Sequence, residues 1–246
     1  MVSRRGALVA GYGRRNLSGS GDVCCRCEAL SEIVLHHCHQ ARSVRSLWLL
    51  YELDVPFTLV MHDFGKELRS EAYLAKHPLG RVPCLEIDGR VLFETGAITE
   101  YLCEKFESSL GRKAGDPERM EWLQWLHYAE TVAVHGASLT QQHIVIFEDK
   151  DRSPMVMKLE ARRLEKALEV LDAQLQGRKY LLSDFSAVDV SVGYSVFVAQ
   201  HFVGLGQFKA LSGWMARLRD RGAFAKALLS NGKTSIYQRE FYGILN

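Results

Sequence analysis

Residues 77–99 read HPLGRVPCLEIDGRVLFETGAIT, and this stretch decides the fold. Two short apolar runs, at residues 82–87 and 90–93, flank an Asp-Gly pair. Such a pair between two apolar runs is the strongest local signal for a β-hairpin with a two-residue turn. Residues 94–106 then carry apolar side chains at helical spacing. The stretch therefore predicts two antiparallel strands followed by a helix.

A parallel half precedes this hairpin. Residues 33–36 and 57–61 are short apolar runs typical of strands. Between them, residues 40–53 place apolar side chains at the i, i+3, i+4, i+7 spacing of one helix face. A short helix near residues 70–76 leads back to the hairpin. The predicted order over this part of the chain is βαβαββα.

The chain changes character after the hairpin unit. Residues 31–107 form the predicted mixed domain, and residues 108–117 are polar and marked by Gly and Pro, which is typical of an interdomain linker. Residues 118–230 are expected to be entirely helical, with the apolar segment at 190–199 buried at the centre. Residues 231–246 are expected to form a tail. The predicted fold class is thus α+β.

The composition is that of a globular protein. The chain has 246 residues, of which 31 are basic and 29 acidic, so its net charge is +2. This balance gives no electrostatic reason to expect a nucleic-acid or anionic-membrane partner, and no apolar run approaches the roughly 18 residues that span a bilayer. Six cysteines are too few for a disulfide scaffold. We therefore expect a cytoplasmic protein with no nucleic-acid or membrane partner.

The first part of the chain differs from the rest. Residues 1–30 are rich in Arg and Gly, poor in acidic residues, and show no sustained period of 2 or 3.6. We expect this segment to be a disordered leader. Two further interpretations remain open: a mitochondrial presequence, which shares this composition, and an upstream start codon on a chain that begins near residue 30.

Val82 and Pro83 stand at the start of a predicted strand, directly after a loop. Proline in that position removes a hydrogen-bond donor from the sheet. A cis peptide there would turn the N–H and C=O groups of Val82 outward, where they could pair with an extended peptide ligand. An ordinary trans turn proline is the alternative.

Glu94 and Thr95 stand where the second hairpin strand ends and a helix begins. A hydroxyl at this N-cap position accepts hydrogen bonds from the helix amides, and a helix N-terminus favours a carboxylate ligand. Glu94 beside it can pair with an ammonium group. Together the two residues suit an α-amino-acid head, whereas a plain N-cap would explain Thr95 alone.

Residues 185–189, FSAVD, open the apolar segment at 190–199. Ser186 and Asp189 stand in capping-box relation, with aspartate in place of the usual glutamate. Because no water reaches the amides of a buried helix start, the cap is expected to stabilise the fold by about 0.5–2 kcal/mol. We interpret this motif as structural.

Together these motifs resemble the cytosolic glutathione S-transferases. The matching segments are HPLGRVPCL at 77–85, FETGAITEYL at 93–102 and FSAVD at 185–189, within a similarity that extends from about residue 32 to residue 230. The resemblance implies a thioredoxin-like N-terminal domain followed by an all-helical bundle. It also implies a homodimer, glutathione as co-substrate and no metal.

The resemblance implies a glutathione-binding site formed by Arg81, Val82, Pro83, Glu94 and Thr95. Val82, which precedes Pro83, is expected to pair with the cysteinyl backbone of glutathione. Glu94 and Thr95 are expected to hold its γ-glutamyl head. Arg81 takes the position near the glycyl end, where the family often has Lys or Gln.

The catalytic residue implied by the resemblance is Cys38. Serine-type members place a serine after the first strand, four residues before an arginine of the first helix, and counting back from Arg42 leads to Cys38. A helix N-terminus lowers thiol pKa values, as would an imidazolium at His37 or His39, so we expect Cys38 to be a thiolate. A passive, buried cysteine is the alternative.

The sequence thus predicts a glutathione transferase of the serine/cysteine type, similar to bacterial members. We expect it to transfer glutathione to a small-molecule electrophile in detoxification, or to exchange glutathione with a mixed disulfide through Cys38, with a leaning towards exchange. The alternative is a non-catalytic binding or regulatory protein with the same fold.

Overall fold

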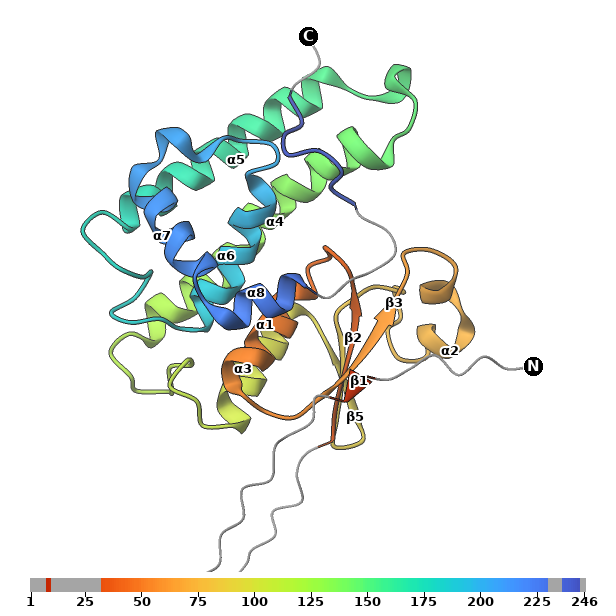
Figure 1. Cartoon of the computed structure of the whole chain (residues 1–246), viewed down its shortest axis with the longest axis vertical. Helices are drawn as coiled ribbons and strands as arrows, with labels where there is room; N and C mark the ends of the chain where they lie inside the picture. Colours follow the sequence, from red (N-terminus) through yellow and green to blue (C-terminus); the bar gives the residue numbers. More distant parts are fainter. Residues whose placement is uncertain (1–7, 10–31, 230–235, 244–246) are drawn as a thin grey trace, which may run out of the picture.

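The computed structural model describes residues 8–9, 32–229 and 236–243 (Figure 1). Most of the expected leader at 1–30 lies outside these residues. Leu8–Val9 is the exception, because this segment forms strand β1 at one edge of the sheet. Residues 236–243, which belong to the expected tail, are hydrogen-bonded to the rest of the molecule.

The described strands form one mixed sheet in the order β1-β3-β2-β4-β5. Their bounds are Ile33–Cys38 for β2, Thr58–His62 for β3, Cys84–Ile87 for β4 and Arg90–Phe93 for β5. β2 runs parallel to β3 and antiparallel to β4, and β4 is antiparallel to β5. The predicted hairpin is confirmed: Asp88 and Gly89 have φ values of 51° and 73°, and a type I′ turn requires positive φ at both positions.

Helices accompany the sheet in the predicted βαβαββα order. They are α1 (Val44–Leu53), a 3₁₀ turn η1 (Glu67–Arg69), α2 (Glu71–Leu74) and α3 (Thr95–Lys105). The prediction that the first helix begins at Gln40 is wrong. Gln40 has a φ of 58°, a left-handed conformation that a right-handed helix excludes, so α1 begins only at Val44.

The remaining regular elements of the described chain are all helical, as predicted for residues 118–230. The elements are α4 (Arg119–Thr140), η2 (Gln141–Val145), η3 (Asp149–Asp151), α5 (Pro154–Gln174), α6 (Ala187–Ala199), η4 (Leu205–Gln207), α7 (Lys209–Arg219) and α8 (Gly222–Leu228). Helix α4 ends at Thr140, and the π-type turn η2 follows it, in which the Ile146 N–H donates to the Gln141 carbonyl at 3.0 Å. β-branched residues at 144–146 disfavour a continued α-helix. Among the described residues, no helix is long and apolar enough to cross a membrane.

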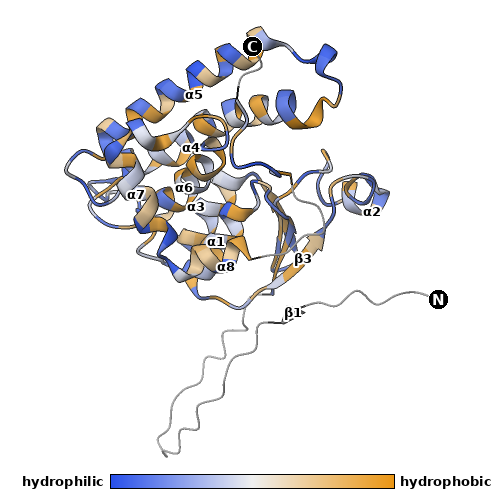
Figure 2. Ribbon diagram, turned by 45° about the horizontal axis from the view of Figure 1, so that its top comes forward, coloured by the Kyte–Doolittle hydropathy of each residue, from blue (hydrophilic) through white to orange (hydrophobic). Residues whose placement is uncertain are grey.

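Helix α6 is buried at the centre of the helical domain, as its apolar sequence predicts, whereas α5 shows hydrophilic residues along its outer side (Figure 2). Helix α6 packs against α4 and α1. Gly193 permits the close approach: an added Cβ would lie 2.6 Å from Leu218 Cδ1 and 3.2 Å from Trp48 Cζ3. Trp48 is fully buried on α1, so this contact joins the sheet domain to the helical domain.

The predicted capping box at the start of α6 is confirmed. One carboxylate oxygen of Asp189 accepts the Ser186 N–H at 3.0 Å. The other oxygen accepts the Leu181 N–H at 3.1 Å and Trp214 Nε1 at 2.9 Å. Because Asp189 is fully buried, a single carboxylate satisfies buried donors from three segments of the chain.

Candidate functional site

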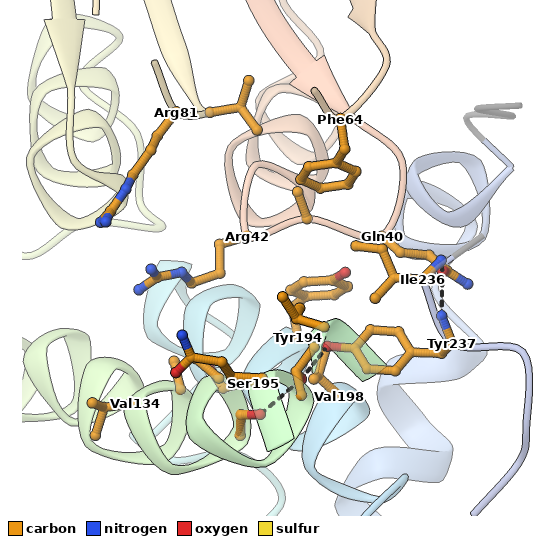
Figure 3. A pocket seen from close by; sticks show the side chains of 18 of the residues that line it. Gln40, Arg42, Phe64, Arg81, Val134, Tyr194, Ser195, Val198, Ile236 and Tyr237 are labelled. Carbon is orange, nitrogen blue, oxygen red and sulfur yellow. Dashed lines mark hydrogen bonds between the residues drawn. The ribbon is translucent and has the colours of Figure 1, made fainter. Parts of the chain in front are cut away.

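A cavity of about 520 Å³ lies between the sheet domain and the helical domain (Figure 3). The turn after β2 and the loop before β4 form one wall, and α4, α6 and the segment 236–243 form the other. Its polar or charged lining residues include Gln40, Arg42, Arg45, Arg81, Ser138, Thr140, Gln141, Tyr194, Ser195 and Tyr237.

Two of the predicted site residues, Arg81 and Val82, line the cavity. The peptide bond between Val82 and Pro83 is cis, which is one of the two alternatives that the sequence left open. Within the described part of the chain, the N–H and C=O groups of Val82 make no hydrogen bond, so both are available to an extended ligand. The preceding loop is held by Tyr73, whose hydroxyl donates to the Arg81 carbonyl at 2.7 Å. Gly80 allows the loop to pack closely, because its φ is 58° and an added Cβ would lie 2.4 Å from the Leu68 carbonyl oxygen.

The N-terminus of α3 adjoins this loop. The ring centroids of His77, in the loop, and Phe93, just before α3, lie 4.8 Å apart. Glu94 is the N-cap residue, with a φ of 78°, and no side chain caps the first amides. The expectation that Thr95 caps the helix is wrong, because Thr95 is the first helical residue and its hydroxyl is bonded to Arg45. The Glu94 carboxylate is exposed and makes no ion pair with the described residues. An uncapped helix N-terminus beside a free carboxylate suits a ligand that carries both an anion and a cation.

A buried arginine, Arg45, lies behind Thr95 and is 1% exposed. Its Nη1 donates to Thr95 Oγ1 at 3.1 Å and forms an ion pair with the Glu130 carboxylate. Its Nη2 donates to Ser195 Oγ at 2.7 Å and to a backbone carbonyl of α4 at 3.1 Å. One cation therefore ties α1 to α3, α4 and α6 directly beside the cavity.

The thiol of Cys38 does not match the expectation. It is fully buried and is not among the residues that line the cavity. Burial, together with the negative charges of Asp63 and Glu67, raises the pKa of Cys38 to about 12. Burial also lowers the pKa of His37 to about 3, so no imidazolium charge stands beside the thiol. The prediction of a thiolate is wrong, because Cys38 ends a buried strand and α1 begins only at Val44.

Counting from the arginine inside the helix leads to a different residue. Arg42 lies in the turn before α1, whereas Arg45 lies within it. Four residues before Arg45 is Ala41, which lines the cavity and carries no hydroxyl. The lining residues of this fully described turn, Gln40, Ala41 and Arg42, thus include no hydroxyl or thiol.

The histidines of β2 have separate partners. His36 Nδ1 lies 2.8 Å from His62 Nε2, and His36 Nε2 lies 2.6 Å from the Glu86 carboxylate. His37 Nδ1 lies 2.8 Å from Ser43 Oγ. In the part of the chain that is described, no group of three or more His, Cys, Asp and Glu residues is arranged to hold a metal ion.

The segment 236–243 forms one side of the cavity, a role that the expected tail did not include. The side-chain oxygen of Gln40 accepts the N–H of Ile236 at 2.6 Å and that of Tyr237 at 2.9 Å. The Tyr237 hydroxyl is hydrogen-bonded to Thr140 Oγ1 at 3.1 Å. These contacts connect the turn after β2 to the end of α4.

Sequence reasoning missed four residues at or beside the cavity: Arg45, Glu130, Tyr194 and Tyr237. Arg45 follows Val44 and precedes an apolar run, and a charge at the start of a buried helix was the available signal. Tyr194 stands within an almost wholly apolar helix, where a polar atom requires an explanation. Glu130 and Tyr237 carry no local signal, because their partners are distant in sequence.

Comparison with known sequences identifies the N-terminal domain. Residues 31–104 match the profile described as "Glutathione S-transferase, N-terminal domain". Glutathione S-transferase 3 of Schizosaccharomyces pombe is 29% identical over 78% of this chain and 84% of its own length. Glutathione S-transferase F9 of Arabidopsis thaliana is 33% identical over 60% of this chain and 71% of its own length.

Comparison with solved structures extends the likeness to both domains. The theta class glutathione S-transferase from Xanthomonas axonopodis pv. citri, with glutathione bound, has a TM-score of 0.72 at 25% identity, over 81% of this chain and 98% of that one. A glutathione transferase from Pseudomonas putida, with glutathione disulfide bound, has the same fold, with a TM-score of 0.73 at 20% identity over 84% and 95% of the two chains. With its thioredoxin-like sheet, cis-proline loop and helical second domain, this chain belongs to the glutathione S-transferase family.

Proposed function

We propose that this protein is a glutathione transferase that binds glutathione between the Val82 loop and the N-terminus of α3, and conjugates it to a small apolar electrophile. The observation that carries the proposal is the combination of unpaired backbone groups at Val82 with an uncapped helix N-terminus at Glu94. The glutathione bound in the X. axonopodis structure and the glutathione disulfide bound in the P. putida structure support it.

Each part of an extended γ-glutamyl tripeptide has a proposed partner. The cysteinyl backbone pairs with the N–H and C=O of Val82, in the manner of an added strand. The γ-glutamyl ammonium binds Glu94, and the γ-glutamyl carboxylate binds the free amides of α3. Arg81, exposed at the edge of the cavity, suits the glycyl carboxylate. Thr95 acts indirectly, because its hydroxyl is bonded to Arg45.

The proposed second substrate follows from the apolar wall of the cavity. Apolar lining residues include Phe64, Leu68, Ala133, Val134, Ala137, Val145, Val198 and Ile236. An adjoining hollow of about 660 Å³ shares Phe64, Val145 and Ile236 and adds Phe147. A wall of this kind favours an apolar small molecule with few polar groups.

We propose conjugation, not disulfide exchange, as the reaction. Exchange through Cys38 requires a thiol that is accessible and ionised. The Cys38 thiol is fully buried, and its pKa is raised to about 12. The Cys38→Ala variant is therefore expected to keep its conjugation activity.

One observation favours a second candidate function, that of a glutathione-binding protein without turnover. Ala41 brings a methyl group to the cavity where the serine-type members carry their hydroxyl, so the turn presents no hydroxyl to a thiol in the cavity. Turnover of a chloronitrobenzene by the wild-type protein, measured with saturating glutathione, distinguishes the transferase from the binding protein.

Replacing Glu94 by alanine is expected to weaken glutathione binding by about 1–3 kcal/mol, since the ligand's ammonium loses its charged partner. Calorimetric titration at neutral pH measures this change. Glu104→Ala is the matched control, because Glu104 is an exposed carboxylate near the other end of α3 and its loss should leave the affinity unchanged. Equal affinities of wild type and Glu94→Ala would overturn the proposed position of the γ-glutamyl head.

We also propose that the protein is a homodimer. Apolar side chains remain exposed on the edge strand β5 and on α3, with Val91 43%, Phe93 38% and Tyr101 38% exposed. Exposed edges and apolar patches of this kind are normally covered. Light scattering at micromolar concentration is expected to give twice the 27.8 kDa mass of the chain. A species of the single-chain mass would contradict the proposal.

A further inference from the structure

Tyr194 on α6 lines the cavity, and the proposed function leaves it without a role. Its side chain is 2% exposed, and its ring stacks on Phe197 with the centroids 6.1 Å apart. Figure 3 shows the ring among the cavity side chains, between Phe64 and Tyr237 in this view. The close contacts of the neighbouring Gly193 fix this turn of α6 against α1 and α7. The position of the Tyr194 ring is therefore set by the core of the protein.

The Tyr194 hydroxyl has no hydrogen-bond partner among the described residues. Some polar atoms, such as Ser46 Oγ and Ser191 Oγ, are fully buried and also lack a partner. The Tyr194 oxygen is not one of these fully buried atoms, so it is open to the cavity. The Tyr237 hydroxyl differs, since it is bonded to Thr140 at 3.1 Å. Because a buried tyrosine normally gives its O–H a partner, the open donor points to a ligand group in the cavity.

Arginines and one further tyrosine line the cavity together with Tyr194. Arg42 and Arg45 come from the α1 side, Tyr237 from the segment 236–243, and the Glu130 carboxylate of α4 is paired with both arginines. Burial raises the pKa of Tyr194 well above its usual value. The hydroxyl therefore keeps its proton, and remains a donor, at neutral and mildly alkaline pH.

The lining residues of the opposite wall carry no hydroxyl or thiol. Ala41 presents a methyl group, and the Cys38 thiol is sealed in the core. Glutathione paired with Val82, as proposed above, directs its cysteinyl side chain into this cavity. A thiolate that leaves water needs a hydrogen-bond donor to stabilise its charge.

We propose that the Tyr194 hydroxyl donates a hydrogen bond to the sulfur of bound glutathione and stabilises it as a thiolate; this inference rests on the proposed function. The thiol S–H bond breaks and its proton passes to solvent, while Tyr194 keeps its own proton. The sulfur electron pair then forms the C–S bond, and the electrophile either releases its leaving group as an anion or takes a proton from solvent. No oxidation or reduction occurs.

The test compares Tyr194→Phe with the wild type, because phenylalanine keeps the ring and removes only the O–H. The pKa of the bound glutathione thiol, read from the ultraviolet absorbance of the thiolate, is expected to rise by about one unit or more. At a pH below that pKa, kcat/KM for a chloronitrobenzene is expected to fall about tenfold or more. The KM for glutathione should change little, since the tripeptide is held elsewhere.

Two controls separate this effect from a general disturbance. In Tyr128→Phe, the lost hydroxyl is one that donates to the Ala167 carbonyl at 3.1 Å, away from the cavity, and the thiol pKa should not change. S-methylglutathione has no thiol proton, so Tyr194→Phe and wild type should bind it equally.

The outcomes distinguish the inference from the proposed function. An unchanged thiol pKa in Tyr194→Phe overturns the inference, as does an equal rise in Tyr128→Phe. A raised thiol pKa in Arg42→Ala, with none in Tyr194→Phe, would assign the role to Arg42 instead. If the wild type binds neither glutathione nor S-methylglutathione, the proposed function is overturned and the inference with it.

Discussion

Replacing Glu130 by alanine is expected to lower the free energy of unfolding by about 3 kcal/mol or more. The Arg45 side chain is 1% exposed, and Glu130 provides the carboxylate that faces it. Without that carboxylate, a buried guanidinium keeps only neutral partners such as Thr95 and Ser195. A buried charge that loses its partner is costly, even where the intact pair contributes little. Urea denaturation measures the change as a shifted midpoint at constant slope.

Arg42→Ala is the matched control for Glu130→Ala. The Arg42 side chain binds the same carboxylate at 2.8 Å but is 46% exposed. An exposed ion pair contributes about 0–1 kcal/mol, so the loss should stay within that range. Glu130→Gln should give an intermediate loss, because it keeps hydrogen bonding and removes only the charge. Equal losses in Glu130→Ala and Arg42→Ala would contradict the argument that the burial of Arg45 makes the pair costly to break.

The parts of the fold that depend on neighbouring residues could be predicted from the sequence. The turn at Asp88 and Gly89 depends on two φ values, and Gly and Asp are suited to both. The capping box of Ser186 and Asp189 depends on a spacing of three residues. Local energies of this kind decide the structure wherever no distant contact opposes them.

The start of α1 could not be predicted, because a distant contact decides it. The side chain of Gln40 accepts two backbone N–H groups from residues 236 and 237, which lie 196 and 197 positions later in the chain. Gln40 itself has a left-handed φ, so the turn continues to Val44. The candidate site differs from the predicted one for the same reason. Cys38 remains in the strand, and the turn presents Ala41 to the cavity.

Replacing Asp189 by alanine is expected to lower the free energy of unfolding by about 3 kcal/mol or more, because several buried donors lose their acceptor together. These donors are the N–H groups of Ser186 and Leu181 and the indole N–H of Trp214. Ser153→Ala is the matched control. Ser153 caps α5 by accepting the Val156 N–H at 3.3 Å at an exposed site. Its loss should cost about 1 kcal/mol.

The difference between wild type and Asp189→Ala is also expected to depend on pH. Burial raises the pKa of Asp189 from 3.8 to about 6. Between these values the folded protein holds a proton that the unfolded chain releases, so the associated stability is fully present below 3.8 and is lost as the pH rises through about 6. The alanine variant lacks this contribution. The free energy of unfolding of the variant should therefore fall further below that of the wild type near pH 4 than at pH 7. A difference that grows with pH would show that the hydrogen bonds to the carboxylate outweigh the cost of its burial.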